Sequence, residues 1–298
     1  MPPENISEPE RFKGIPVSPY LAPDEGRIEL MEFSFVQITD HHLLDSHEKL
    51  IRGYSPSHAF RSVLRHIGDN HGNVDFVVST GDLVEHGTDT EYQYLRLLLG
   101  LADCSHAPGP QISSAEGLHG MPFYFLPGNH DPREAFFRNM FPLHPNQSSG
   151  DSRMNVSFFH KGVQFLCIDW GWKEKGIVTD SILNQLAIAL EGGTPSILLS
   201  HHPVTPPGVA RLDGMVPDEI DQFAAVIRDK NVLAIFSGHV HSSYSGKIAG
   251  KSAYGLRSTQ YGYAQVGEEW LPVLRPPQYR VIHVSGGSLR TELVDVRI

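Results

Sequence analysis

The chain has 298 residues, of which 40% are hydrophobic, and a formal net charge of −10. A chain of this length can bury one large core, and no low-complexity linker or internal repeat divides it, so we expect a single domain at 30–298 behind an N-terminal arm at 1–29. The negative charge argues against a nonspecific nucleic-acid surface or a membrane-binding surface, because both require clustered lysines and arginines.

Two cysteines, Cys104 and Cys167, are too few for a disulfide framework, and their spacing is not that of a zinc site. Residues 1–27 contain prolines and acidic residues but no basic start followed by an apolar core. We therefore expect no secretory signal, and no apolar run in the sequence is long enough to span a membrane. These features predict a cytoplasmic protein.

Strands and helices alternate in the first half of the sequence, which is typical of βαβ units. The apolar run that ends before Gly81 is too short for a helix and predicts a buried strand. A segment rich in Pro, Gly and Ser at 102–120 predicts a surface loop or insertion. The expected elements are a strand at 32–39, a helix at 57–70 with Ser57 as its N-cap, a strand at 76–78, a helix at 88–101, a strand at 122–126 and a short helix at 135–140.

The pattern changes after Met154, where two strands joined by Lys161-Gly162 predict a hairpin and so a second sheet with antiparallel parts. The C-terminal strands, from about 243 to 298, are expected to complete this second sheet. The expected elements are strands at 156–160 and 163–169, a helix at 179–190, a strand at 196–199, a helix at 218–229, a strand at 232–236, and antiparallel strands with turns at 249–250 and 285–287.

Five of the predicted strands end in a polar cluster. The carboxyl ends of parallel strands are where α/β proteins carry their sites. One aspartate after one strand is more often a solvated turn residue, but five clusters in order indicate a shared site. Their side chains suit borderline and hard divalent ions and include no thiolate. The clusters are Asp40-His41-His42, Gly81-Asp82, Gly128-Asn129-His130-Asp131, His201-His202-Pro203 and Gly238-His239-Val240-His241.

The number of candidate ligands predicts two ions. Residues at i and i+2 of an extended segment project to the same side, so Asp40 and His42 can reach one ion, as can one histidine of the pair His239 and His241. Seven or eight ligands are too many for a single ion. Two ions about 3.5–4 Å apart and bridged by one carboxylate account for them, and such sites perform in-line displacement at phosphorus.

The ordered series Asp-x-His, Gly-Asp, Gly-Asn-His-Asp, His-His-Pro and Gly-His-x-His resembles the calcineurin-like metallophosphoesterase superfamily over residues 32 to about 241. The resemblance implies an α/β fold, a four-layer α/β/β/α sandwich with two mixed sheets. It also implies two divalent ions (Mn, Fe or Zn) and in-line attack by a hydroxide that bridges them. One ion would take Asp40, His42, Asp82 and His241, and the other Asp82, Asn129, His201 and His239.

The resemblance also assigns roles beside the ions. His130 would stabilise the transition state and protonate the leaving group, and Asp131 is expected to orient His130. His41 points away from its neighbours if the segment is extended, and it is retained as a candidate substrate contact. His202 is expected to pack or to hydrogen-bond rather than to bind metal.

Residues that follow the ligands separate the subgroups of the superfamily. Protein phosphatases follow Gly-Asp with a segment that holds a phosphate-binding arginine, and purple acid phosphatases have a metal-ligating tyrosine three residues after the aspartate. This chain has neither, since Glu85 stands at the tyrosine position. The segments 81–88, 126–131 and 258–260 are most similar to class III cyclic-nucleotide phosphodiesterases and glycerophosphodiesterases. The chain departs from that pattern in the 102–120 insertion, in the N-terminal arm and in a long loop expected at 270–278.

This similarity implies a phosphodiesterase that acts on a small-molecule substrate, either a 3′,5′-cyclic nucleotide or a glycerophosphodiester-like compound. Arg211 or Asp213 would then contact the substrate. A nuclease or a phosphomonoesterase of the same superfamily is the alternative, and a non-catalytic scaffold is a third hypothesis. The C-terminal strands and the segment with Trp270 and Leu271 are a candidate homodimer contact.

Overall fold

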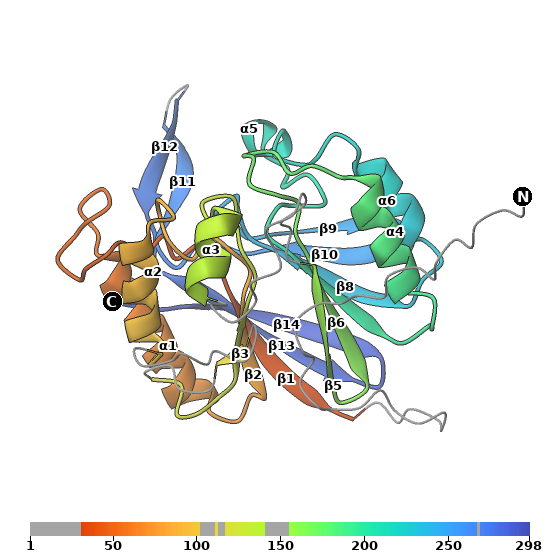
Figure 1. The fold of residues 1–298 in the computed structure, drawn as a ribbon, viewed down its shortest axis with the longest axis horizontal. Coiled ribbons are helices and arrows are strands. Elements are labelled where there is room, and N and C mark those ends of the chain that lie inside the picture. Colours follow the sequence, from red (N-terminus) through yellow and green to blue (C-terminus); the bar gives the residue numbers. More distant parts are fainter. Residues whose placement is uncertain (1–30, 102–110, 113–116, 141–154, 267–268) are drawn as a thin grey trace, which may run out of the picture.

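The computed structural model describes residues 31–101, 111–112, 117–140, 155–266 and 269–298. Two six-stranded sheets face each other, and helices cover the outer face of each (Figure 1). The four-layer sandwich that the sequence implied is therefore confirmed. The N-terminal arm at 1–29 lies outside the described residues, and the single domain at 30–298 stays a prediction.

The first sheet has the strand order β14-β13-β1-β2-β4-β3. Strands β1, β2 and β4 are parallel, and β3, β13 and β14 each run antiparallel to a neighbour, so the sheet is mixed. Its parallel strands lie at its centre and carry their carboxyl ends to one edge. The bounds are β1 (Phe33–Ile38), β2 (Phe76–Ser79), β3 (Gln111–Ile112), β4 (Phe123–Phe125), β13 (Gln278–Ser285) and β14 (Ser288–Asp295).

The second sheet has the order β5-β6-β7-β8-β10-β9, with β6, β7, β8 and β10 parallel. Strands β5 and β6 form the predicted hairpin, whose turn residues Lys161 (φ 45°) and Gly162 (φ 84°) are both left-handed, as a two-residue hairpin turn requires. The bounds are β5 (Val156–His160), β6 (Val163–Ile168), β7 (Ser196–Ser200), β8 (Val232–Ser237), β9 (Tyr244–Ile248) and β10 (Lys251–Gly255).

The helices divide between the two sheets (Figure 1). Buried residues of α1, α2 and α3 pack against the first sheet, and those of α4 and α6 pack against the second. Among the described residues no helix is both long enough and apolar enough to cross a bilayer. The bounds are α1 (Pro56–His71), α2 (Asp89–Leu98), α3 (Arg133–Met140), α4 (Asp180–Ala189), α5 (Ala210–Asp213) and α6 (Ile220–Ile227).

The start of α1 corrects one prediction. The N-cap is Ser55, whose hydroxyl accepts a hydrogen bond from the amide of His58, and the expected cap Ser57 is a buried helical residue. Pro56 fixes a helical φ at the first position, where its missing N–H costs nothing, so the helix begins earlier than its apolar pattern indicates.

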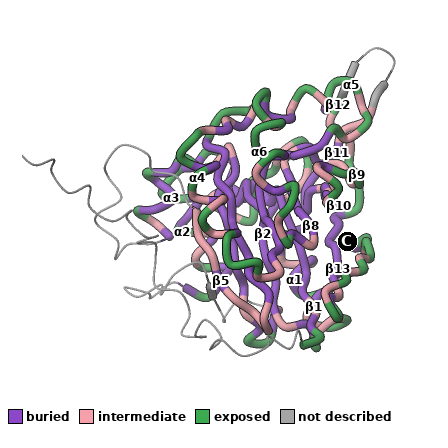
Figure 2. Tube along the Cα trace, turned by 90° about the vertical axis from the view of Figure 1, so that its right-hand side faces the viewer, coloured by how far each residue is buried: buried purple, intermediate pink, exposed green. Residues whose placement is uncertain are grey.

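Hydrophobic side chains form three cores, one between the sheets and one between each sheet and its helices. In the inter-sheet core the ring centroid of Phe35 lies 5.0 Å from that of Phe76 and 5.3 Å from that of Phe165. The next residue, Val36, faces the helix layer, as the two-residue period of a strand requires. Figure 2 shows the strands as a buried interior within a more exposed shell of loops and helix faces.

The C-terminal strands correct a second prediction. Strands β9 and β10 join the second sheet as expected, but β13 pairs antiparallel with β1 and thus extends the first sheet together with β14. The pairing sets Ile282 opposite Phe35 in the inter-sheet core. Strands β11 (Tyr261–Val266) and β12 (Glu269–Leu274) form a separate two-stranded hairpin, so most of the loop expected at 270–278 is a strand.

Candidate metal centre

The polar clusters of the sequence meet at one place. Asp40 and His42 follow β1, Asp82 follows β2, and Asn129 follows β4, all at the carboxyl edge of the first sheet. The three remaining candidate ligands follow parallel strands of the second sheet, His201 after β7 and His239 and His241 after β8. The sandwich therefore brings the seven predicted ligands together from both of its sheets.

The backbone at these strand ends turns sharply. Five of the seven candidate ligands have left-handed φ values, between 47° and 69°, which is uncommon for residues other than glycine: Asp40, His42, Asp82, His239 and His241. Such backbone strain persists only where the surroundings hold it, and it clusters at functional sites. The expectation that Asp40 and His42 share a side because the segment is extended was therefore wrong in its reason, since turns orient both side chains.

Two glycines allow the strand ends to approach one another. A Cβ on Gly128 would lie 2.1 Å from Oδ1 of Asp82, and a Cβ on Gly81 would lie 2.5 Å from Nδ1 of His201. Either contact is far shorter than van der Waals distance. Glycine at these positions is thus a packing requirement of the ligand cluster.

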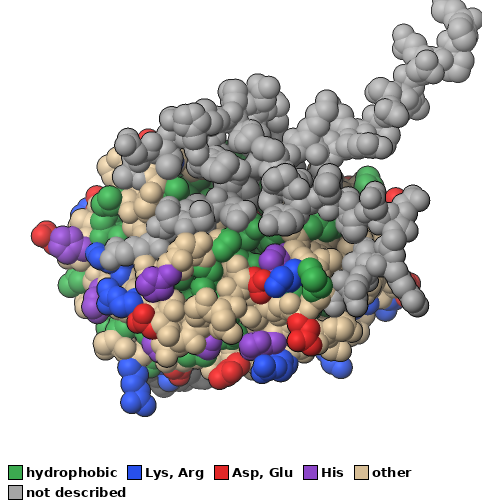
Figure 3. Space-filling view, turned by 90° about the horizontal axis from the view of Figure 1, so that it is seen from below, with side chains coloured by type: hydrophobic (Ala, Val, Ile, Leu, Met, Phe, Trp, Pro, Cys, Tyr) green, Lys and Arg blue, Asp and Glu red, His purple; other side chains and the backbone are tan. Residues whose placement is uncertain are grey.

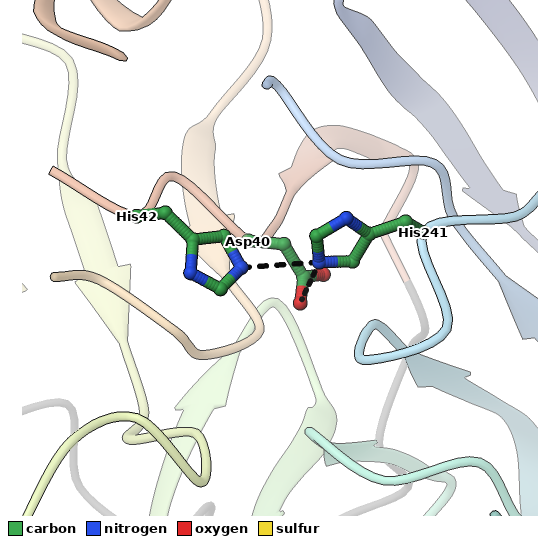
Figure 4. Close-up of side chains that lie close together, drawn as sticks. All are labelled: Asp40, His42 and His241. Carbon is green, nitrogen blue, oxygen red and sulfur yellow. Dashed lines mark hydrogen bonds and ion pairs between the residues drawn. The ribbon is translucent and has the colours of Figure 1, made fainter. Parts of the chain in front are cut away.

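The first ligand group consists of Asp40, His42 and His241 (Figure 4). Nε2 of His42 lies 3.0 Å from Nε2 of His241, which in turn lies 3.3 Å from Oδ1 of Asp40. Oδ2 of Asp82 is 3.6 Å from Nε2 of His42. All four side chains are at most 4% exposed, so their charges have little solvent to stabilise them.

The second ligand group consists of Asp82, Asn129, His201 and His239. Nε2 of His201 lies 2.9 Å from Oδ1 of Asn129, 3.3 Å from Oδ2 of Asp82 and 3.2 Å from Nδ1 of His239. Because Oδ2 of Asp82 lies 3.6 Å from His42 of the first group and 3.3 Å from His201 of the second, this carboxylate contacts both groups.

The donor atoms fit a cation. Nδ1 of His42 lies 2.7 Å from Oε2 of Glu85 in an ion-pair contact, and Nδ1 of His241 donates to the carbonyl of Tyr261 (2.9 Å). The two Nε2 atoms face each other at 3.0 Å, a position that a proton on one ring or a metal cation between them can fill. His201 is held in the same way, since its Nδ1 donates to the carbonyl of Thr80 (2.9 Å). Fixing the far nitrogen of each ring is how proteins orient histidine ligands.

Electrostatics favour the same conclusion. Burial opposes the charge of Asp82, but the neighbouring His201 and His42 hold the pKa of this carboxyl well below its ordinary value. Burial also opposes the charge of His201, yet Asp82 raises its pKa to about 9. Burial lowers the pKa of His239 to about 3, so this ring stays neutral. The carboxylates thus attract positive charge to this position, which a metal ion can supply in place of a proton.

His130 borders the cluster on its open side. Its backbone amide donates to Oδ1 of Asp82 (2.8 Å), and its Nδ1 donates to the backbone carbonyl of Glu85 (2.7 Å). The ring is partly exposed and lines the pocket over the candidate ligands. With Nδ1 held by Glu85, the ring is oriented for proton transfer at its other nitrogen.

Asp131 does not orient His130, which corrects the sequence-based expectation. Its carboxylate is fully buried and accepts hydrogen bonds from the amides of Leu83 (3.0 Å) and Gly128 (2.8 Å) and from the hydroxyl of Tyr92 (3.0 Å). The amides of Leu83 and Gly128 lie in the loops after β2 and β4, so the Asp131 carboxylate joins these two loops. Asp131 therefore stabilises the loop backbone, whereas Nδ1 of His130 is held by the carbonyl of Glu85.

Glu85 is the residue that the sequence interpretation missed. Its carboxylate forms an ion pair with His42, and its carbonyl accepts a hydrogen bond from His130. One residue therefore contacts both a candidate ligand and the candidate acid. Burial opposes ionisation of this carboxyl, but the bond from His42 lowers its pKa. The sequence showed that Glu85 stands where purple acid phosphatases have a tyrosine, three residues after Asp82. A carboxylate at that position was itself the signal that could have identified this residue.

The pocket above the ligands has a volume of about 340 Å³. Tyr261 and Tyr263 of β11 line it, as do Glu174 and Arg211. The β11–β12 hairpin and α5, which carries Arg211, lie at the same end of the molecule (Figure 1). Volumes of this size are typical of small-molecule sites.

Two candidate substrate residues lie elsewhere. Oδ1 of Asp213 accepts from the amides of Gly208 (2.8 Å) and Val209 (3.1 Å), so this side chain closes its own loop. His41 is fully buried and is not part of the pocket lining, because its ring lies between two hydroxyls of the interior. Of the three candidates, only Arg211 lines the pocket.

His202 packs and hydrogen-bonds as expected. It is 1% exposed, and its Nε2 donates to the carbonyl of Lys173 (2.8 Å), in the loop that carries Glu174. Burial lowers its pKa well below the ordinary value, and the nearby rings of His239 and His201 lower it further. The neutral ring of His202 thus connects the end of β7 to the loop that carries the pocket residue Glu174.

Fold and site together define a hydrolase of the metallophosphoesterase type, with candidate metal ligands at the carboxyl ends of strands from two facing sheets. The profile of the calcineurin-like phosphoesterase family matches residues 33–243 of this chain. The chain belongs to this family.

Individual relatives are more distant. Glycerophosphodiester phosphodiesterase GpdQ of Enterobacter lignolyticus is 27% identical over 210 residues, which cover 69% of this chain and 69% of that protein. The 3′,5′-cyclic-nucleotide phosphodiesterase of a Nostoc species is 24% identical over 278 residues, which cover 89% and 93%. A dimetal phosphatase structure from Danio rerio is similar with a TM-score of 0.54 at 14% identity, covering 89% of this chain and 99% of that one, and it supports the fold alone.

Proposed function

We propose that the protein hydrolyses a small-molecule phosphodiester with two divalent ions, one held by each ligand group. The observation that carries this proposal is the position of Asp82, whose carboxylate lies 3.6 Å from His42 and 3.3 Å from His201, members of different groups. Ions bound there would activate a water nucleophile and neutralise phosphoryl charge. The oxygen and imidazole donors suit Mn, Fe or Zn.

The chain's own residues supply the remaining roles. Asn129 and His130 line the pocket directly over the ligand cluster, where the phosphorus would lie. His130 protonates the leaving oxygen, since its Nδ1 is held by Glu85 and its ring is the partly exposed acid group next to Asp82. The buried ligand cluster below excludes bulk water from the other side of the phosphorus.

The substrate that the pocket favours carries an aromatic group. The rings of Tyr261 and Tyr263 lie 4.7 and 5.6 Å from that of His241, so an aromatic wall begins directly beside the first ligand group. A nucleobase can stack on such a wall, whereas a glycerol group gains little from it. We therefore propose a 3′,5′-cyclic nucleotide as the substrate and a glycerophosphodiester as the second candidate, in keeping with the names of the relatives.

The first experiment tests the reaction class. With Mn²⁺ added to metal-free protein, we expect hydrolysis of bis(p-nitrophenyl) phosphate to exceed that of p-nitrophenyl phosphate, and the Asn129→Ala variant should be strongly impaired. Activity that does not depend on metal, or a clear preference for the monoester, would contradict the proposal.

The second experiment separates the two substrates. Tyr263→Ala removes a ring of the wall without replacing a candidate ligand. Base stacking is worth about 1–3 kcal/mol, or about 5- to 150-fold in KM. The variant should therefore raise KM for 3′,5′-cyclic AMP and leave KM for a glycerophosphodiester nearly unchanged. Equal effects on both substrates would remove the argument for the nucleotide.

A nuclease remains the alternative within the same chemistry. Figure 3 shows one face of the molecule, on which positive and negative side chains are interspersed among the described residues. Together with the net charge of −10, this favours a small substrate over a nucleic acid. A DNA-degradation assay at moderate salt distinguishes the two, and metal analysis distinguishes either enzyme from a scaffold.

A homodimer is a further part of the proposal. Leu271 and Leu274 of β12 are 40% and 53% exposed, so the hairpin presents apolar side chains to solvent. Measurement of the molar mass in solution tests this, and replacing both leucines with serine should shift a dimer toward the monomer.

A further inference from the structure

His41 is a buried histidine that the proposed reaction does not use. It lies between the candidate ligands Asp40 and His42 in sequence, yet its ring points into the interior and is 0% exposed. Nε2 lies 2.7 Å from the hydroxyl of Ser79, at the end of β2, and Nδ1 lies 2.9 Å from the hydroxyl of Thr259. One imidazole thus joins three segments that are far apart in the sequence.

The turn that contains Thr259 is fastened to the end of β1 at two further points. The hydroxyl of Ser258 donates to the carbonyl of Asp40 (2.6 Å), and the amide of Thr259 donates to the carbonyl of Thr39 (3.1 Å). The same Ser258 hydroxyl accepts from the amide of Gln260 (2.8 Å), which fixes the turn internally. The segment 258–260 is therefore shaped around the backbone of the first ligand group.

The next residue after this turn completes the connection. The carbonyl of Tyr261 accepts the Nδ1 proton of His241, and the Tyr261 ring lines the pocket 5.9 Å from that of His42. Tyr261 also begins the β11–β12 hairpin, whose described strands pair with no strand of either large sheet. The position of both the carbonyl and the aromatic wall therefore depends on how the preceding turn is held.

We propose that His41, Ser79 and Thr259 form a latch that sets the position of the first ligand group and of the β11 wall. The latch acts through the 258–260 turn on His241, and through the backbone on Asp40 and His42. His41 is thus a positioning residue for one metal position. In the described residues the second ligand group meets the latch at Asp82, whose backbone carbonyl accepts from the amide of His41 (2.8 Å), and this backbone bond survives substitution of the His41 ring. No bond joins Asn129, His201 or His239 to the latch in the same residues, so the second group is largely independent of it. The inference rests on the proposed binuclear function.

The expected size follows from what such supporting contacts contribute elsewhere. Loss of a residue that orients a metal ligand typically weakens metal affinity about 10–100-fold. His41→Phe keeps a ring in contact with Phe60, whose centroid lies 4.6 Å away, but removes both hydrogen bonds. Thr259→Val removes one hydroxyl at nearly constant volume and is the milder variant if His41→Phe folds poorly.

The experiment is a Mn²⁺ titration of metal-free protein by calorimetry, with the folded state checked by circular dichroism. The Asp40→Ala variant identifies which binding step belongs to the first ligand group. We expect His41→Phe to weaken that step about 10–100-fold and to leave the other step nearly unchanged, with Thr259→Val in between. The matched control is Ser57→Ala, which removes a buried hydroxyl that bonds Tyr94 (2.7 Å) on the helix layer and should change neither step.

Two outcomes would overturn the inference. If the unmodified protein binds two ions and both latch variants bind them equally well while unfolding at lower temperature, His41 is an ordinary core residue and only the latch is wrong. If the unmodified protein binds no Mn²⁺, the proposed function and the latch are both wrong. A KM measurement adds a second readout, because displacement of Tyr261 should raise KM in Thr259→Val, whereas a purely structural role should leave it unchanged.

Discussion

At the scale of single residues, Glu85 links the candidate ligand His42 to the candidate acid His130. Its carboxylate lies 2.7 Å from Nδ1 of His42, and its carbonyl accepts a hydrogen bond from Nδ1 of His130 (2.7 Å). The carbonyl bond survives any substitution, because it belongs to the backbone. The side chain can therefore be tested separately from the orientation of His130.

Glu85→Ala should weaken binding of one Mn²⁺ ion about 10–100-fold, because His42 loses the acceptor that fixes its ring. Glu85→Gln retains an acceptor oxygen and should lose less. Calorimetric titration measures both variants. Equal Mn²⁺ affinity in Glu85→Ala and the unmodified protein would show that the bond does not support the ligand.

His130→Ala should reduce kcat about 10²–10⁴-fold, the usual contribution of a general acid. Metal content should be retained, since the seven candidate ligands remain. Steady-state kinetics with metal analysis on the same sample tests this. Loss of bound metal together with activity would instead make His130 a ligand.

The residue scale also shows where sequence reasoning stops. The pattern of Asp, Asn and His after successive strands predicted which side chains lie together. The carboxyl ends of parallel strands in one sheet are neighbours for any loop conformation. The partners of Asp131 were not predictable, since they depend on the left-handed turn at Asp82 (φ 50°), which no local pattern encodes. The metal-binding role of the seven residues stays a prediction that the geometry supports.

At the scale of elements, one arginine fastens the loop after β4 to the second sheet. Arg133, 5% exposed, donates from Nε to Oδ2 of Asp169 (2.7 Å) and from Nη1 to the carbonyls of Gly128 (2.6 Å) and Asp131 (2.5 Å). Burial opposes the charge of Arg133, but the carboxylate of Asp169 outweighs this effect and raises the pKa of the guanidinium. The loop that carries Asn129 and His130 is thus held by a buried ion pair.

Arg133→Met should destabilise the fold by about 3–5 kcal/mol, because it leaves the carboxylate of Asp169 buried without its partner. The matched control is Arg138→Met on the same helix, which breaks an exposed pair with Asp89 and should change stability little. Urea unfolding of both variants gives the comparison. Similar losses in the two variants would mean that burial of the pair is unimportant.

Elements also differ in how far the sequence predicts them. Five of the helices and most strands follow from apolar spacing over a few neighbouring residues, and their predicted positions agree with the structure within a few residues, whereas the short α5 was expected to be a loop. The membership of β13 in the first sheet does not follow from apolar spacing, because it depends on pairing with β1 at the other end of the chain. Alternation makes β13 a strand but says nothing about which sheet edge it joins.

At the scale of the whole molecule, a polar contact joins the two sheets at the end remote from the ligands. Nε2 of His160, at the end of β5, donates to Oδ1 of Asp75, just before β2, at 3.0 Å. Burial lowers the pKa of His160 even though Asp75 acts in the opposite direction. The folded state therefore prefers this ring neutral.

The sign of the pH effect follows. In the unfolded chain His160 titrates near its ordinary pKa of about 6.5, so below that pH the unfolded state binds more protons and stability falls. Between pH 7 and pH 5 the urea midpoint of the unmodified protein should therefore decrease more than that of His160→Gln. A smaller decrease in the unmodified protein would show that the ion pair with Asp75 outweighs burial.

The central claim is that Asp82 serves both ligand groups, and metal content measures this most directly. After metal-free protein is equilibrated with Mn²⁺ and desalted, we expect two ions per chain in the unmodified protein, mainly one lost in Asp40→Ala, and both reduced in Asp82→Ala. The account would be contradicted if Asp82→Ala retained as much Mn²⁺ as Asp40→Ala.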